Sequence, residues 1–211
     1  MKNYVKNLKI AIIPLLLALW GLFLLNFLDP FSSRTVDPEF AYLINGLNCA
    51  QLHFNWIGHF DHPGTPFQIY CGIIIKITHV FAGNGDMAQD VFANPNFYLK
   101  AISISIFLLQ IFLLLAIGLV AQKREIPIGQ IFLLQSGFLF NDVVIWLFSR
   151  VNPDVFFVIV TTLFILIYLK FGYKEYSSRK FAIWGGVVMG LGFATKFNYL
   201  PILILPFIFI H

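Results

Sequence analysis

Charged residues are scarce in this chain. Its 211 residues include 14 Lys and Arg and 10 Asp and Glu, so charged side chains make up 11% of the sequence and hydrophobic residues 59%. Soluble domains carry about 25% charged residues, and so few charges leave too little polar surface to cover a globule in water. The scarcity excludes an ordinary soluble domain and predicts an integral membrane protein.

Two further patterns are missing. The apolar blocks lack the alternation of apolar and polar residues that is typical of a membrane β-barrel, so we expect helices. Cys49 and Cys71 form no CxxC pair, and we expect unpaired core thiols rather than a disulfide. The net charge of +4 does not indicate a nucleic-acid partner, because in membrane proteins the positions of Lys and Arg follow from the membrane topology. We expect no nucleic-acid partner.

Long uncharged runs occupy most of the chain. A helix needs about 20 residues to cross the hydrocarbon core. The runs predict an all-α fold, a polytopic transmembrane helix bundle in which residues 1–211 form one domain. The predicted spans cover about 10–28, 101–122, 126–149, 155–171, 181–195 and 197–211.

The apolar segment 65–82 is ambiguous, because it has the length of a span but carries a lysine and a histidine. If it crossed the membrane, Lys123 and Arg124 would lie outside, against the positive-inside rule. We therefore expect it to lie on or dip into the outer face, so that 29–97 form one large extracytoplasmic loop. The N-terminus is then cytoplasmic, with nine of the fourteen Lys and Arg inside. These nine are Lys2, Lys6, Lys9, Lys123, Arg124, Lys170, Lys174, Arg179 and Lys180.

Helical spacing within this loop predicts an amphipathic interfacial helix over 40–56. The residues expected on its apolar side are Phe40, Leu43, Ile44 and Leu47. Those expected on its polar side are Asn45, Asn48, Gln51 and Asn55. The segment 82–96 is rich in Gly, Asn and Asp and predicts a connecting loop.

Three helices on the outer face are predicted to begin with a proline that follows a good N-cap residue. The three dipeptides are Asp37-Pro38, Thr65-Pro66 and Asn152-Pro153. A structural role stays open for two acids on this basis. Asp37 fits a helix cap, and Asp154 fits a first turn, where negative charge is favoured.

Acidic and histidine side chains gather in the first outer loop. The stretch Asp37-Pro38-Glu39-Phe40-Ala41-Tyr42 follows the first predicted span. After a short gap comes His59-Phe60-Asp61-His62-Pro63-Gly64-Thr65-Pro66. Such groups cost solvation energy at the mouth of a membrane bundle, so their presence indicates chemistry or coordination.

These two stretches resemble the first outer loop of the GT-C superfamily of membrane glycosyltransferases. The resemblance is to the branch of protein O-mannosyltransferases and lipid A aminoarabinose transferases, which carries Asp-Glu-x-x-Tyr-like and His-Pro-Pro-like motifs there. Arg150-Val151-Asn152-Pro153-Asp154 and Ala194-Thr195-Lys196-Phe197 resemble two later motifs. The resemblance covers essentially the whole chain. Two departures are that Pro38 separates the acids and that Gly64 follows His62-Pro63.

The resemblance implies a glycosyltransferase that takes a sugar from a polyprenyl-phosphate carrier on the extracytoplasmic face. On the matched positions, Asp37 is the candidate base with Glu39 as the alternative, and Asp154 is a second acid that orients the acceptor or the sugar. Lys196 and Arg150 are candidates for binding the phosphate. The remaining candidate substrate-binding residues are Asp61, His62 and Tyr42.

A metal site is the alternative interpretation of His53, His59 and His62 with Asp61. Their spacing matches no zinc pattern. The resemblance also implies no ion, since GT-C enzymes that use simple polyprenyl-phosphate sugars generally need none. We expect no cofactor, with a divalent metal as the open alternative.

The expected partners are a polyprenyl-phosphate-linked sugar donor and membrane lipids, and the acceptor class stays open. Two competing hypotheses are a transporter or flippase of lipid-linked saccharides and an inactive truncated remnant. Because relatives in this branch continue through several more spans, we expect the chain to be the N-terminal part of a longer enzyme. The branch favours a multi-pass protein of the bacterial inner membrane.

Overall fold

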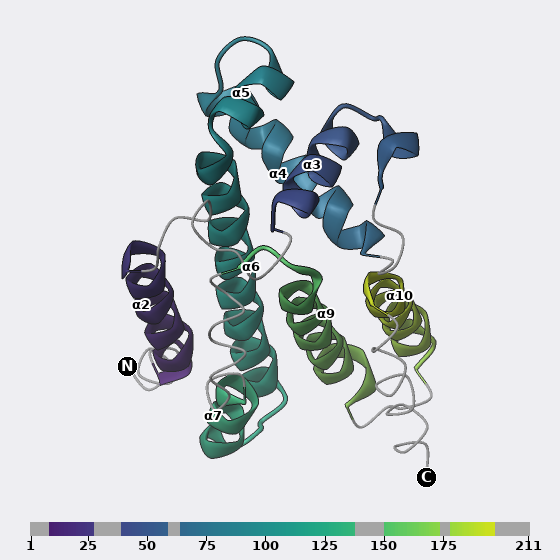
Figure 1. Cartoon of the computed structure of the whole chain (residues 1–211). Coiled ribbons are helices and arrows are strands. Elements are labelled where there is room, and N and C mark those ends of the chain that lie inside the picture. Colours follow the sequence, from purple (N-terminus) through teal and green to yellow (C-terminus); the bar gives the residue numbers. More distant parts are fainter. Residues whose placement is uncertain (1–8, 28–38, 59–63, 138–149, 174–177, 197–211) are drawn as a thin grey trace.

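The computed structural model of the chain describes residues 9–27, 39–58, 64–137, 150–173 and 178–196 (Figure 1). All regular secondary structure within these residues is helical, which confirms the predicted all-α class. The elements in chain order are α2 (Ile12–Phe27), α3 (Glu39–Ala50), the 3-10 turn η2 (Phe54–Trp56), α4 (Thr65–Ala82), α5 (Met87–Ala93), α6 (Pro95–Lys123), α7 (Ile128–Ser136), α9 (Pro153–Ile167), the π-helical turn η3 (Tyr168–Gly172) and α10 (Arg179–Thr195).

Two described helices are long and apolar enough to cross a membrane. The first is α6, with 29 residues, and the second is α9 continued by η3, with 20 residues. A third candidate is the pair α4 and α5. Only the two helices together are long and apolar enough to cross, and they bend by 94° where they meet. The described helices are therefore compatible with a membrane protein.

The central element is α6, which packs against α2, α4, α7 and α9. In Figure 1 it is the long central helix, with α5 above its upper end, α2 on one flank and α9 on the other. Polar side chains bond across these helices: Gln110 Nε2 donates to Thr162 Oγ1 of α9 at 3.1 Å. Gln135 Nε2 donates to the carbonyls of Ile10 and Leu114, at 3.1 and 2.9 Å. Interhelical bonds of this kind contribute about 0.6–2 kcal/mol each in membranes.

The helices α3 and α4 pack closely through two glycines. A Cβ at Gly46 would lie 2.8 Å from Cys71 Cβ, and a Cβ at Gly72 would lie 2.7 Å from Cys49 Cβ. One turn earlier, the rings of Tyr42 and Phe67 meet edge-on with centroids 5.4 Å apart. Small residues at the crossing let the two backbones approach.

This packing places part of the predicted polar side of α3 inside the protein. On the predicted apolar side, Leu43 and Leu47 are buried, while Phe40 is 37% exposed and Ile44 is 43% exposed. Asn45 is buried, and its Oδ1 accepts a hydrogen bond from the Gly58 amide at 3.3 Å. The reason is that α4 covers the face carrying the small residues, rather than the face with the most hydrophobic ones.

The connection predicted between 82 and 96 contains a helix, α5, so the prediction of a loop was wrong there. Asp86 caps α5, because its Oδ1 accepts from the amides of Ala88 and Gln89 at 3.0 Å each. The next helix, α6, begins at a proline that was not predicted as a helix start, Pro95.

The helix starts predicted at prolines agree with the structure to different degrees. Pro153 begins α9, and Asn152 caps it by accepting from the Val155 amide at 3.2 Å, which confirms that start. The α4 helix begins at Thr65 with Gly64 as its N-cap, one residue earlier than predicted. Pro38 lies outside the described residues, as do the predicted span 197–211 and the second half of 126–149.

The two ends of the helix bundle differ in charge. The start of α2, the end of α6, the end of η3 and the start of α10 lie at one end, where Arg124 Nη2 donates to the Lys170 carbonyl at 2.5 Å (Figure 1). We call this the basic end. Its described cations are Lys9, Lys123, Arg124, Lys170, Arg179 and Lys180. The starts of α6 and α9 and the end of α10 lie at the opposite end, next to α3, α4 and α5.

Candidate active site

The start of α3 contacts the start of α9 at the end opposite the basic end. The Glu39 carboxylate is only 1% exposed, and its Oε1 accepts a hydrogen bond from the Val151 amide at 3.4 Å. Arg150, next to Val151, is also buried, at 7% exposure. A buried carboxylate and a buried guanidinium thus occupy neighbouring segments that are 112 residues apart in the chain.

A second contact joins α9 to the end of α10. Lys196 Nζ lies 2.5 Å from Asp154 Oδ1. The side chain of Lys196 is 19% exposed and that of Asp154 is 44% exposed, so the pair is open to its surroundings on the side of the acid. Asp154 stands in the first turn of α9, where the helix dipole favours a negative charge.

A third contact brings in the His62-Pro63-Gly64 motif through its last residue. The Gly64 amide donates to the Thr195 carbonyl at 3.0 Å, directly before Lys196. Gly64 adopts φ +41°, in the left-handed region. A proline cannot adopt this φ. The turn at this position therefore requires the glycine that stands where the His-Pro-Pro-like motif has its second proline.

Three of the eight predicted site residues take part in these two contacts, and a fourth lies next to one of them in sequence. Glu39 accepts the Val151 amide, Arg150 precedes Val151, and Asp154 and Lys196 form the α9–α10 contact. Tyr42 is 3% exposed and packs in the core against Phe67, one turn along α3. The other three, Asp37, Asp61 and His62, lie outside the described residues.

The described residues include no group of three or more His, Cys, Asp or Glu side chains that would hold a metal ion. His53 packs against the Trp56 ring with centroids 4.7 Å apart, and His59 and His62 lie outside the described part. Both cysteines are free and buried, as predicted. Burial raises the pKa of the Cys49 thiol, which makes it a poor metal ligand.

A polar cluster at the corner of α4, α5 and α6 was not predicted. The Tyr98 hydroxyl donates to Asp90 Oδ2 at 2.5 Å. His79 Nδ1 lies 3.3 Å from the same oxygen and 3.1 Å from the Tyr98 hydroxyl. The Asn84 amide and the Asn94 side chain also donate to Asp90, at 3.2 and 2.9 Å. These bonds link α4, α5 and α6 at the 94° bend between α4 and α5. Of these contacts, only the one between Asp90 and Asn94 has a spacing, four residues, that a helix would bring together.

Another residue that sequence reasoning missed is Gln68, in the second turn of α4. It is 0% exposed, and within the described part of the chain neither of its amide atoms has a hydrogen-bond partner. No periodicity distinguishes such a glutamine from a surface one.

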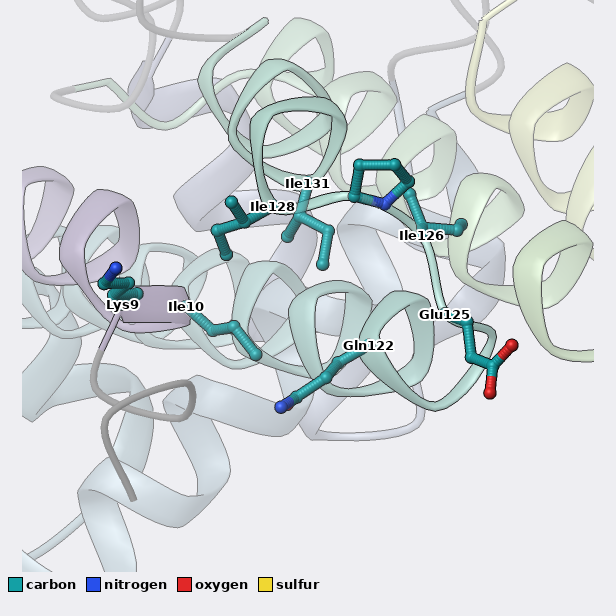
Figure 2. A pocket seen from close by; sticks show the side chains of 8 residues that line it. Lys9, Ile10, Gln122, Glu125, Ile126, Ile128 and Ile131 are labelled. Atoms are coloured by element: carbon teal, nitrogen blue, oxygen red, sulfur yellow. The ribbon is translucent and has the colours of Figure 1, made fainter. Parts of the chain in front are cut away.

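A pocket of about 500 Å³ opens at the basic end, between α2, α6 and α7 (Figure 2). Its polar lining consists of Lys9, Gln122 and Glu125, whose side chains point in different directions in the view. None of the predicted site residues lines it. We therefore place the candidate site at the opposite end, on chemical grounds.

The described site combines two carboxylates and two cations, contributed by α3, the start of α9 and the end of α10. Such a set supplies acid–base groups beside fixed positive charge. Comparisons of the chain with models of protein families, with curated proteins and with solved structures find no match.

Proposed function

We propose that this chain is a membrane glycosyltransferase of GT-C type. It moves a sugar from a polyprenyl-phosphate carrier to an acceptor on the extracytoplasmic face. The observation that carries the proposal is that Glu39 bonds to the segment 150–154, which carries Arg150 and Asp154, and that Asp154 pairs with Lys196 from a third distant segment. These are the positions that the resemblance had assigned to catalysis and phosphate binding.

The reaction makes one bond and breaks one. An acceptor hydroxyl oxygen attacks the anomeric carbon of the sugar, its proton passes to a carboxylate base, and the bond from that carbon to the phosphate oxygen breaks. The electron pair leaves with the polyprenyl phosphate. A positioned base contributes roughly 10²–10⁴-fold to the rate. Fixed cations stabilise the charge that develops on the leaving phosphate, and we assign this role to Lys196 and Arg150.

The contacts of Glu39 favour Asp37 as the base. Glu39 is buried and accepts the Val151 amide, so its carboxylate is committed to joining α3 and α9. We therefore assign Glu39 a positioning role and keep Asp37 as the proposed base. Asp154 is proposed to orient the acceptor hydroxyl or the sugar, with Asp61 and His62 lining the site.

The proposed topology is a polytopic bundle with a cytoplasmic N-terminus, in a bacterial inner membrane. It is supported by the basic end, which collects six described cations, as the positive-inside rule requires of the cytoplasmic side. The 94° corner between α4 and α5 is compatible with an element that dips into the outer face. The outer loop 29–97 then carries α3 and α4 beside the start of α9 and the end of α10, and α5 beside the start of α6.

The proposal is tested with the purified natural full-length protein in proteoliposomes. The substrates are polyprenyl phosphates carrying labelled hexoses or pentoses. We expect release of the polyprenyl phosphate and transfer of the label, and Lys196→Met should lower the rate roughly tenfold or more. Lys180→Met, which removes a cation at the basic end, is the matched control and should leave the rate unchanged. Translocation of intact donor across the membrane without cleavage would contradict a transferase and indicate a flippase.

A further inference from the structure

We propose that the Asp154 carboxylate occupies the anion-binding position of Lys196 until the phosphate of the donor displaces it. The inference rests on the proposed function and adds a regulatory step to the same site. Its geometric basis is the distance of 2.5 Å between Lys196 Nζ and Asp154 Oδ1. Within the described part of the chain, Asp154 is the acid that pairs with this lysine.

Each partner is held where an exchange is feasible. Lys196 directly follows the last residue of α10, and its backbone amide donates to the Gly192 carbonyl at 3.1 Å, so the base of the side chain is fixed. Its four-carbon stem lets the ammonium reorient toward a new anion. Asp154 is 44% exposed, which means that a ligand can approach the pair from the side of the acid.

The electrostatics favour replacing one anion by another. The pair is partly exposed, at 19% for Lys196 and 44% for Asp154, so it contributes less stability than a fully buried pair and less is lost when it opens. Lysine binds phosphate as a compact point charge, and the phosphate restores the neutralisation of Lys196. The released Asp154 stays in the first turn of α9, near the positive end of the helix dipole.

The exchange orders the two substrates. Before the donor binds, Asp154 is engaged with Lys196 and is not available to an acceptor hydroxyl. Once the phosphate has taken the lysine, the carboxylate is free to accept a hydrogen bond from the acceptor. The donor therefore binds first, and the acceptor joins a site that the donor has opened.

The test measures binding of farnesyl phosphate to the purified full-length protein by titration calorimetry, with neutral farnesol and inorganic phosphate as comparison ligands. We expect Asp154→Asn to tighten farnesyl phosphate binding about fivefold, because the competing carboxylate is gone. Lys196→Met should weaken it roughly tenfold or more. Asp86→Asn is the matched control: it removes one negative charge from α5 but keeps a good N-cap, so the affinity should not change.

The outcomes separate the exchange from the glycosyltransferase proposal. Weaker or unchanged binding in Asp154→Asn overturns the exchange, even if sugar transfer occurs, and so does the absence of binding in both wild type and Asp154→Asn. Equal tightening in Asp86→Asn also overturns it, because net charge alone then explains the gain. Tightening for inorganic phosphate alone would identify a free-phosphate site rather than a lipid headgroup site. Tightening for farnesyl phosphate, with farnesol unaffected, supports the exchange as stated.

Discussion

The Glu39 carboxylate accepts a hydrogen bond from the Val151 amide at 3.4 Å, across a separation of 112 residues in the chain. This contact anchors the outer-loop helix α3 to the start of α9. It holds the start of α3, from Glu39 on, beside the segment that carries Asp154. The acid that is buried and engaged here is not the acid to which we assign proton transfer.

The first prediction separates these two roles. Glu39→Gln keeps an oxygen that can accept the Val151 amide, so we expect a folded protein with most of its transfer activity. Glu39→Ala leaves that amide without its acceptor and should destabilise the protein by about 1–3 kcal/mol. Thermal unfolding in detergent and the transfer assay check both variants. A stable but inactive Glu39→Gln protein would instead make Glu39 the base.

The second prediction concerns the α3–α4 crossing. A Cβ at Gly72 would lie 2.7 Å from Cys49 Cβ and 2.8 Å from the Gly46 carbonyl oxygen, so the two backbones must separate. We expect Gly72→Ala to destabilise the protein by about 1–3 kcal/mol, measured by thermal unfolding.

Gly186→Ala is the control for this substitution. No described atom lies within 4 Å of a Cβ at Gly186, which is also in a helix interior. It should be neutral or stabilise by up to about 1 kcal/mol. Equal effects of the two substitutions would argue against the close crossing.

The third prediction concerns the corner of α4, α5 and α6. Tyr98→Phe removes the hydroxyl that donates to the Asp90 carboxylate, whereas Tyr70→Phe removes a neutral bond to Ser105 Oγ of 2.9 Å. Because bonds to charged groups are roughly twice as strong as neutral ones, Tyr98→Phe should lower the Tm about twice as much. Both variants should keep transfer activity if the corner is structural. A Tyr98→Phe protein that melts normally but loses activity would indicate a role in catalysis.

The fourth prediction tests the topology by labelling single cysteines with a membrane-impermeant maleimide. The native thiols are a low background, because both cysteines are buried and burial raises the pKa of the Cys49 thiol. Maleimides react with the thiolate, so native Cys49 should react appreciably only at a pH above that at which an exposed thiol ionises. In intact cells, Ala82→Cys on the outer loop should be labelled and Glu125→Cys at the basic end should not. The reverse pattern would invert the proposed orientation.

Much of the helical framework was predictable from the sequence. Uncharged runs bounded by Lys and Asp predict helices where α2, α6, α9 and α10 occur, since length and charge alone decide whether a segment suits a bilayer. The start of α9 followed from Asn152-Pro153, because a cap and a proline at the first position act locally. The burial of Asn45, on the predicted polar side of α3, was not predictable, because it depends on which helix covers Gly46, and that is a tertiary property.

The candidate site was predictable only as a set of separate motifs. Lys196 and Asp154 are 42 residues apart, and no periodicity indicates that they form an ion pair. The resemblance supplied the candidates, and packing supplied the contacts among those that are described. The Asp90–Tyr98 bond is not predictable from the sequence, because the Gly, Asn and Asp residues between 82 and 96 favour a loop over the helix α5. Asp86, which caps α5, is one of several turn-forming residues there.

The central claim is that a carboxylate in the first outer loop removes the acceptor proton during sugar transfer. The most direct measurement compares wild type, Asp37→Asn and the loop control Asp29→Asn in the proteoliposome transfer assay. Membrane insertion and the Tm are checked for each. The account predicts that Asp37→Asn lowers the transfer rate roughly 100-fold or more with normal folding, while Asp29→Asn retains activity. An Asp37→Asn protein that transfers sugar at a rate close to wild type would contradict it.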